Sequence, residues 1–137
     1  MDEAFIKKVQ PNSPEAEQSV IGAMIMDRDA IADVIDIVNA DDFYQKQNGI
    51  LFEAMTELYR EGKPVDLVTL QNKLKKKDVP ESMKSLEFIR DLLEAVPTSA
   101  NAKQYAKIVS EKATLRKLIK VTAVSYTHLT LPTILLV

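Results

Sequence analysis

Apolar residues recur at helical spacing along most of the chain, and turn-forming residues divide this pattern into separate segments. The first segment starts at Ser13 and Pro14, because serine caps helix amino termini and proline is tolerated at the first helical position. Its apolar stripe is wide. We therefore expect a deeply buried helix that runs to about Met26.

Two further helices follow the same pattern. Apolar residues on one face and aspartates on the other predict a second helix over residues 27–38. A third helix is expected to begin at Asp41 or Asp42. It ends where Gly62 supplies a left-handed cap and Pro64 prevents continuation.

Three more helices complete the predicted fold. Asp66 is a plausible cap for a fourth helix, and an amphipathic pattern over residues 82–95 predicts a fifth. Thr98 and Ser99 precede a long sixth helix that is expected to reach about Ala123. The pattern thus indicates an all-α fold, a compact bundle of about six helices.

The last 14 residues differ from everything before them. Residues 124–137 carry no charge if His128 is neutral, and they are rich in threonine and β-branched residues without a helical period. The pattern alone favours a β-strand or hairpin there. Such an addition conflicts with the local consistency of natural sequences.

Composition narrows the class of protein. The 137 residues suit one domain, and the absence of cysteine excludes disulfides, cysteine zinc sites and thiolate catalysis. The amino terminus is acidic rather than signal-like, and the longest apolar run, nine residues, is far below the roughly 20 that span a bilayer. We expect a cytoplasmic protein without a membrane partner.

Charge is unevenly distributed along the chain. The first 70 residues carry 14 acidic and 6 basic side chains, whereas the remaining 67 carry 6 acidic and 12 basic ones. This asymmetry is compatible with an acidic and a basic face used for self-association or for an acidic partner. Uneven use of a solvated surface explains it equally well.

No motif for catalysis or cofactor binding is present. The only Gly-Lys pair, Gly62-Lys63, is followed by proline and lacks the upstream glycine of a phosphate-binding loop. Asp29, Asp33 and Asp36 could face a hard cation, but a solvated helix face is the favoured interpretation. The sequence assigns no catalytic, cofactor-binding or metal-binding residue.

The last long helix carries two candidate surfaces. A basic surface consists of Lys103, Lys107, Lys112, Arg116, Lys117 and Lys120. Such a surface can attract phosphate, although a solvated helix face is the alternative. A self-association or partner surface consists of Tyr105, Ile108, Leu115, Leu118 and Ile119. Packing within the core is the alternative for this second set.

Several strings of residues resemble one family closely, in the same order and spacing from about Val9 to about Ala123. The strings are PEAEQSVIG from Pro14, FY at Phe43, ILFEAM from Ile50, GKPVD from Gly62, SANA from Ser99, YAKIV from Tyr105 and LRKLI from Leu115. The chain resembles the amino-terminal domain of the bacterial replicative DNA helicase DnaB.

The resemblance implies a helical collar of paired subunits on a hexameric ring. It also implies contact with primase and a link to a RecA-like motor that uses ATP and Mg²⁺ to unwind DNA. Because this chain has no phosphate-binding loop, it is expected to be a scaffold rather than an enzyme, while the parent protein is an ATP-dependent helicase. Residues 1–12 are then a flexible arm, and residues 13–123 are the helical domain.

Family members extend the long helix into a helical hairpin, and this chain departs from that pattern after about Ala123. The string VSYTHLTLPT from Val124 looks like a translated sequencing adaptor, so residues 124–137 are interpreted as a non-native tail. With the hairpin incomplete, collar assembly is expected to be impaired and primase binding weak or absent. The alternative function is a free-standing helical nucleic-acid-binding module that uses the basic helix.

Overall fold

The computed structural model describes residues 10–94 and 101–128, with side chains described as far as Val121. Within these ranges the chain forms α-helices and 3₁₀ turns and no strand, which confirms the predicted all-helical class. The elements are α2 (Pro14–Met26), α3 (Arg28–Ile35), η1 (Ala40–Asp42), α4 (Lys46–Arg60), α5 (Leu67–Lys75), η2 (Glu81–Lys84), α6 (Leu86–Glu94) and α7 (Ala102–His128).

Helix α2 lies at the centre of the domain and contacts α3, α4, α6 and α7. It starts as predicted, with the Ser13 hydroxyl accepting the Ala16 amide at 3.2 Å and Pro14 in the first turn. Every residue from Val20 to Ile25 is buried. A helix that is apolar on all sides is stable only when other elements surround it, and α2 supplies most of the core.

The ends of two helices also follow their local sequence signals. Gly62 has a φ of 73°, and the amides of Gly62 and Lys63 bond to the carbonyls of Tyr59 and Leu58, which terminates α4. The Asp66 carboxylate accepts the Thr69 amide at 2.9 Å and thereby caps α5. Both predictions are confirmed.

The predicted start of the third helix at Asp41 or Asp42 is wrong. The Asp42 carboxylate accepts the Asn39 amide at 2.9 Å and closes the short turn η1, so it does not cap α4. Helix α4 begins only at Lys46, and its cap position, Gln45, makes no side-chain capping bond. The amide groups before α4 bond instead to a carboxylate on α2.

Two other helices are shorter than predicted. Helix α3 ends at Ile35 rather than at Val38, although Val38 remains buried. The segment expected as one helix over residues 82–95 is divided into η2 and α6. Ser85 separates them, since its backbone is extended and its hydroxyl accepts the Phe88 amide at 3.1 Å.

The strand or hairpin expected at the carboxyl end is wrong for residues 124–128, which continue α7 as helix. Adding residues to an existing helix needs no new nucleus, so weak helix formers can be incorporated at its end. Residues 129–137, the expected caps Thr98 and Ser99, and residues 1–9 of the expected arm lie outside the described residues.

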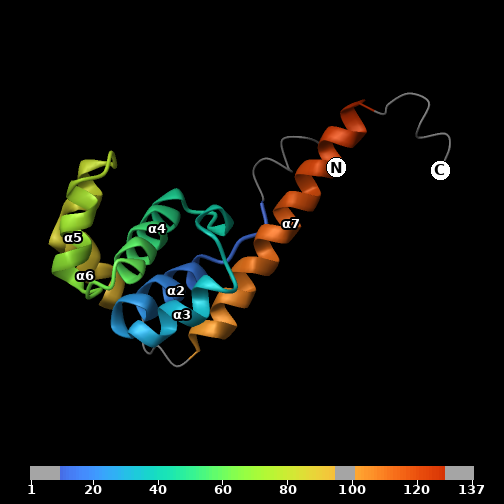
Figure 1. Cartoon of the computed structure of the whole chain (residues 1–137). Coiled ribbons are helices and arrows are strands. Elements are labelled where there is room, and N and C mark those ends of the chain that lie inside the picture. Colours follow the sequence, from blue (N-terminus) through green and yellow to red (C-terminus); the bar gives the residue numbers. More distant parts are fainter. Residues whose placement is uncertain (1–9, 95–100, 129–137) are drawn as a thin grey trace.

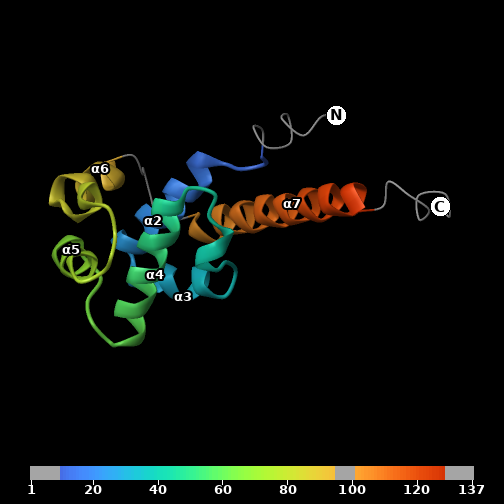
Figure 2. The ribbon, with the colours of Figure 1, turned by 90° about the horizontal axis from the view of Figure 1, so that it is seen from above.

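The described part of the chain is elongated, although its helices run in different directions (Figures 1 and 2). Helices α5 and α6 lie at one end of the domain, and α7 extends away from the other helices at the opposite end (Figures 1 and 2). Helix α7 has 27 residues, which corresponds to about 40 Å of helix. The fold therefore presents the far half of one helix outside its core.

Candidate assembly surface

The first half of α7 is anchored to the core by small side chains. Ala102, Ala106, Val109 and Ala113 recur at helical spacing and are each 5% exposed or less. Such small residues let the axis of α7 approach α2 closely, and these two helices make the most extensive contact in the domain. Beyond Ala113, no described residue of α7 is buried.

The second half of α7 carries an exposed apolar stripe. Leu115, Leu118 and Val121 are 44%, 57% and 61% exposed, and their spacing of three residues keeps them on one side of the helix. We call these three residues the α7 stripe. This part of α7 extends away from the other helices in both views (Figures 1 and 2). Clustered apolar side chains on a projecting helix are typical of a protein contact surface.

The structure divides the apolar residues that the sequence singled out as a self-association surface. Tyr105 and Ile108 are half-buried and pack against the core. Leu115 and Leu118 are exposed, and Ile119 is half-buried. Val121 was not predicted as part of this surface, although its three-residue spacing from Leu118 could have identified it.

The basic residues of α7 do not share one face. An α-helix rotates by about 100° per residue. One side of α7 therefore carries Lys103, Lys107 and Lys117, and another side carries Lys112, Arg116 and Lys120. Arg116 bonds to backbone carbonyls, and the Lys117 Nζ lies 3.7 Å from the Asp42 carboxylate. The six basic side chains therefore do not form one continuous surface that a nucleic-acid backbone could follow.

Arg116 connects α7 to two distant segments. Its Nη1 donates to the Pro11 carbonyl at 2.7 Å, and its Nη2 donates to the Asp42 carbonyl at 2.6 Å. The guanidinium carbon also lies 5.3 Å from the centre of the Tyr44 ring, within cation–π range. These contacts surround the point at which α7 leaves the core.

Glu17 is a buried residue whose role was not predicted from the sequence. It is 1% exposed and accepts the amides of Tyr44 and Gln45 at 2.7 and 3.1 Å and the Asn48 side-chain amide at 3.1 Å. The carboxylate on α2 therefore caps α4 from a distance. Its spacing from the buried residues Val20 and Ile21 placed it on the apolar face, which was the available signal.

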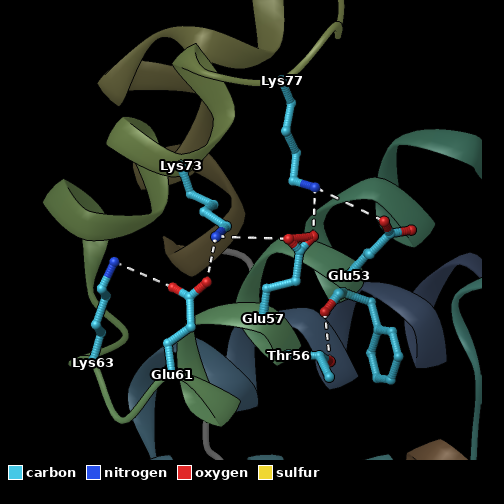
Figure 3. A network of polar contacts seen from close by, with 8 residues as sticks. Glu53, Thr56, Glu57, Glu61, Lys63, Lys73 and Lys77 are labelled. Carbon is cyan, nitrogen blue, oxygen red and sulfur yellow. Dashed lines mark hydrogen bonds and ion pairs between the residues drawn. The ribbon is translucent and has the colours of Figure 1, made fainter.

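A ladder of charges joins α4 to α5 (Figure 3). Lys73 lies 3.0 Å from Glu61 and 3.6 Å from Glu57, and Lys77 pairs with Glu57 and Glu53. The hydrogen bond from Lys73 lowers the pKa of the Glu61 carboxyl below its ordinary value, and the same bond raises the pKa of Lys73. The ladder holds α5 against α4, on the part of the domain away from the α7 stripe.

Other candidate sites are limited. Asp29, Asp33 and Asp36 are exposed, and no grouping of acidic or histidine side chains in the described ranges could hold a metal ion. An open pocket of about 200 Å³ between α3 and α4 is lined by apolar residues such as Ile35 and Phe52 and by polar residues such as Glu57 and Arg60. No helix in the described part of the chain has the length and apolarity needed to cross a membrane.

These features define a small all-helical domain that is built around one buried helix and extends one long helix beyond its core. Residues 9–111 match the family model described as "DnaB-like helicase N terminal domain". The chain belongs to this family.

Relatives and solved structures are consistent with this assignment. The chain is 40% identical over 120 residues to replicative DNA helicase DnaB of Geobacillus stearothermophilus and 37% identical over 120 residues to replicative DNA helicase DnaC of Bacillus subtilis. Each match covers 88% of this chain but only 26% of the relative. The chain thus spans about a quarter of the length of these curated relatives.

The fold matches two solved amino-terminal domains of DnaB helicases. The domain from Mycobacterium tuberculosis superposes with a TM-score of 0.85 at 34% identity, and the match covers 91% of both chains. The domain from Helicobacter pylori gives a TM-score of 0.71 at 22% identity and covers 93% of this chain and 98% of that one. The latter likeness concerns the fold alone.

Proposed function

We propose that this chain is the amino-terminal scaffold of a replicative DNA helicase and that it assembles with further copies through the α7 stripe. The exposed stripe carries the proposal, because it places Leu115, Leu118 and Val121 outside the core on a helix that is itself firmly anchored. Association removes such apolar surface from water and is favourable for that reason. The names of the relatives support the context of DNA replication.

The motor functions belong to the parent protein in this proposal. The chain covers about a quarter of its relatives and has no phosphate-binding loop, so ATP, Mg²⁺ and DNA would be bound by the remainder of a full-length helicase. The chain itself contributes assembly rather than catalysis.

Primase is the proposed second partner. The solved domain from Helicobacter pylori is described together with its interactions with primase, which supports a similar contact here. Since the helical hairpin of the family is incomplete in this chain, we expect collar assembly to be impaired and primase binding to be weak or absent. Calorimetric titration with a bacterial primase tests this expectation. An affinity equal to that of an assembled helicase collar would contradict it.

Sedimentation velocity tests the assembly itself. Leu118→Ser removes the central member of the α7 stripe, and Val68→Ser is a matched control because Val68 is 61% exposed on α5, at the other end of the domain. The unmodified chain should associate weakly with rising concentration, because the incomplete hairpin impairs full collar assembly. The Leu118 variant should remain monomeric, and the Val68 variant should behave like the unmodified chain. Equal sedimentation of all three proteins would refute the proposed surface.

A further inference from the structure

Arg116 occupies the position at which α7 changes from buried to exposed. Among the residues of α7 whose side chains are described, the last buried one is Ala113, and Arg116 lies between Leu115 and Leu118 in sequence. The helix has no buried apolar anchor among its described residues beyond this point. Beyond Ala113, Arg116 and Lys117 supply polar contacts between the helix and the rest of the domain.

The two acceptors of Arg116 come from segments that are far apart in the sequence. Pro11 is 105 residues away and Asp42 is 74 residues away, yet both carbonyls lie within 2.7 Å of the guanidinium nitrogens. Charge-assisted bonds from the planar guanidinium are stronger and more directional than neutral ones. Because both acceptors are backbone carbonyls, only a change at Arg116 itself removes both bonds together.

The segment that follows Asp42 contacts both Arg116 and α2 through Tyr44. The Tyr44 ring packs against the guanidinium, while the Tyr44 amide donates to Glu17 on α2 at 2.7 Å. The amino-terminal segment next to Arg116 contains a local bond, in which the Asn12 side-chain amide donates to the Gln10 carbonyl at 2.8 Å. Of the two segments that Arg116 contacts, the one that follows Asp42 is thus tied to α2.

A small change of angle at Arg116 has a large effect at the end of α7. The 12 residues from Arg116 to His128 span about 18 Å of helix, so a tilt of about 10° moves that end by about 3 Å. Such a displacement is enough to disturb the registry of two packed helices.

We propose that Arg116 is a positioning residue for the α7 stripe: it sets the direction in which α7 leaves the core and couples that direction to the segments of Pro11 and Asp42. The inference rests on the proposed assembly function. It deepens that function by assigning to the amino-terminal segment a control over the geometry of assembly.

Spin-label distance measurements test the direction of α7. The chain contains no cysteine, so Asn72→Cys on α5 and Glu111→Cys on α7 provide a fixed pair, and moving the second label to Thr122→Cys reports the helix beyond Arg116. In an Arg116→Met background, the distance distribution from position 72 to 122 should broaden while that to 111 stays narrow. Equally narrow distributions to both positions would overturn the proposal.

Three substitutions distinguish the effect of the guanidinium group from the effect of a positive charge alone. Arg116→Met should weaken self-association about tenfold, because an interface loses affinity when its surface must be ordered on binding. Arg116→Lys keeps the charge but not the paired donors, and it should give an intermediate effect. Lys120→Met is the matched control, since Lys120 is exposed one turn further along α7, and it should change neither distances nor association.

The outcomes distinguish this inference from the assembly proposal. Absence of association by the unmodified chain would reject the assembly function, while the distance measurements would still decide whether Arg116 directs α7. Unchanged association in Arg116→Met, with normal helical circular dichroism, would reject the positioning role. Broadening in Arg116→Met with partial recovery in Arg116→Lys would support it.

Discussion

Replacing Glu17 by glutamine tests the long-range cap of α4. One carboxylate oxygen accepts the Gln45 amide and the Asn48 side chain, and the other accepts the Tyr44 amide. Glutamine can keep the first two bonds through its carbonyl oxygen, but its NH₂ group then faces the Tyr44 donor. One unsatisfied donor and the lost charge assistance should together reduce the free energy of unfolding by about 2–3 kcal/mol.

Alanine at the same position removes all three bonds. The expected loss is about 3–5 kcal/mol, which is a large fraction of the total stability of a small domain. Urea unfolding followed by circular dichroism measures both variants. If the slope of the free energy of unfolding against urea concentration is unchanged, the loss reflects the stability of the folded state rather than a different unfolded state.

Glu15→Gln is the control for this experiment. Glu15 lies in the same first turn of α2 but is exposed, so its replacement changes the charge near the helix dipole without removing a buried acceptor. We expect a loss of at most about 1 kcal/mol. If Glu17→Gln and Glu15→Gln destabilise the domain equally, the reasoning about the buried cap is refuted.

Three further predictions concern packing, pH and nucleic acid. Gly49→Ala should reduce the free energy of unfolding by about 2 kcal/mol, since the new Cβ would lie 2.7 Å from the Ala40 carbonyl oxygen, and stability within about 0.5 kcal/mol of the unmodified chain would contradict this. Because the pKa of Glu61 is lowered in the folded state, its pairing with Lys73 stabilises the fold above the ordinary value of 4.5 and is lost as the pH falls through the lowered pKa. Glu61→Gln should therefore be less stable than the unmodified chain at pH 7, with the difference vanishing in acid, and a difference that persists at low pH would contradict the assignment. Single-stranded DNA should bind weakly even at low salt, because the basic residues of α7 do not share a face, and tight, steeply salt-dependent binding in an anisotropy titration would favour the alternative module instead.

Local signals made several helices predictable from sequence. The Ser13-Pro14 start of α2, the Gly62 end of α4 and the Asp66 cap of α5 each depend on residues within one turn. Apolar periodicity also identified the centre of the fold, because a helix as uniformly apolar as α2 has to be buried.

The remaining features depend on partners far away in the sequence. The start of α4 is set by Glu17, which is 27 to 31 residues from the groups it binds. Arg116 was assigned to a basic surface because its backbone acceptors could not be anticipated from residues nearby. The division of the α7 residues into anchored and exposed halves likewise depends on where the core ends.

If copies of this chain meet through the α7 stripe, distances between copies test that contact most directly. A single spin label at Glu111→Cys lies on the exposed side of α7 one turn before Leu115, whereas a label at Asn72→Cys lies on α5 at the other end of the domain. We predict a short, well-defined distance between copies for the label at position 111 and none for the label at position 72. A short distance between copies at position 72, or none at position 111 at any protein concentration, would contradict assembly through the stripe.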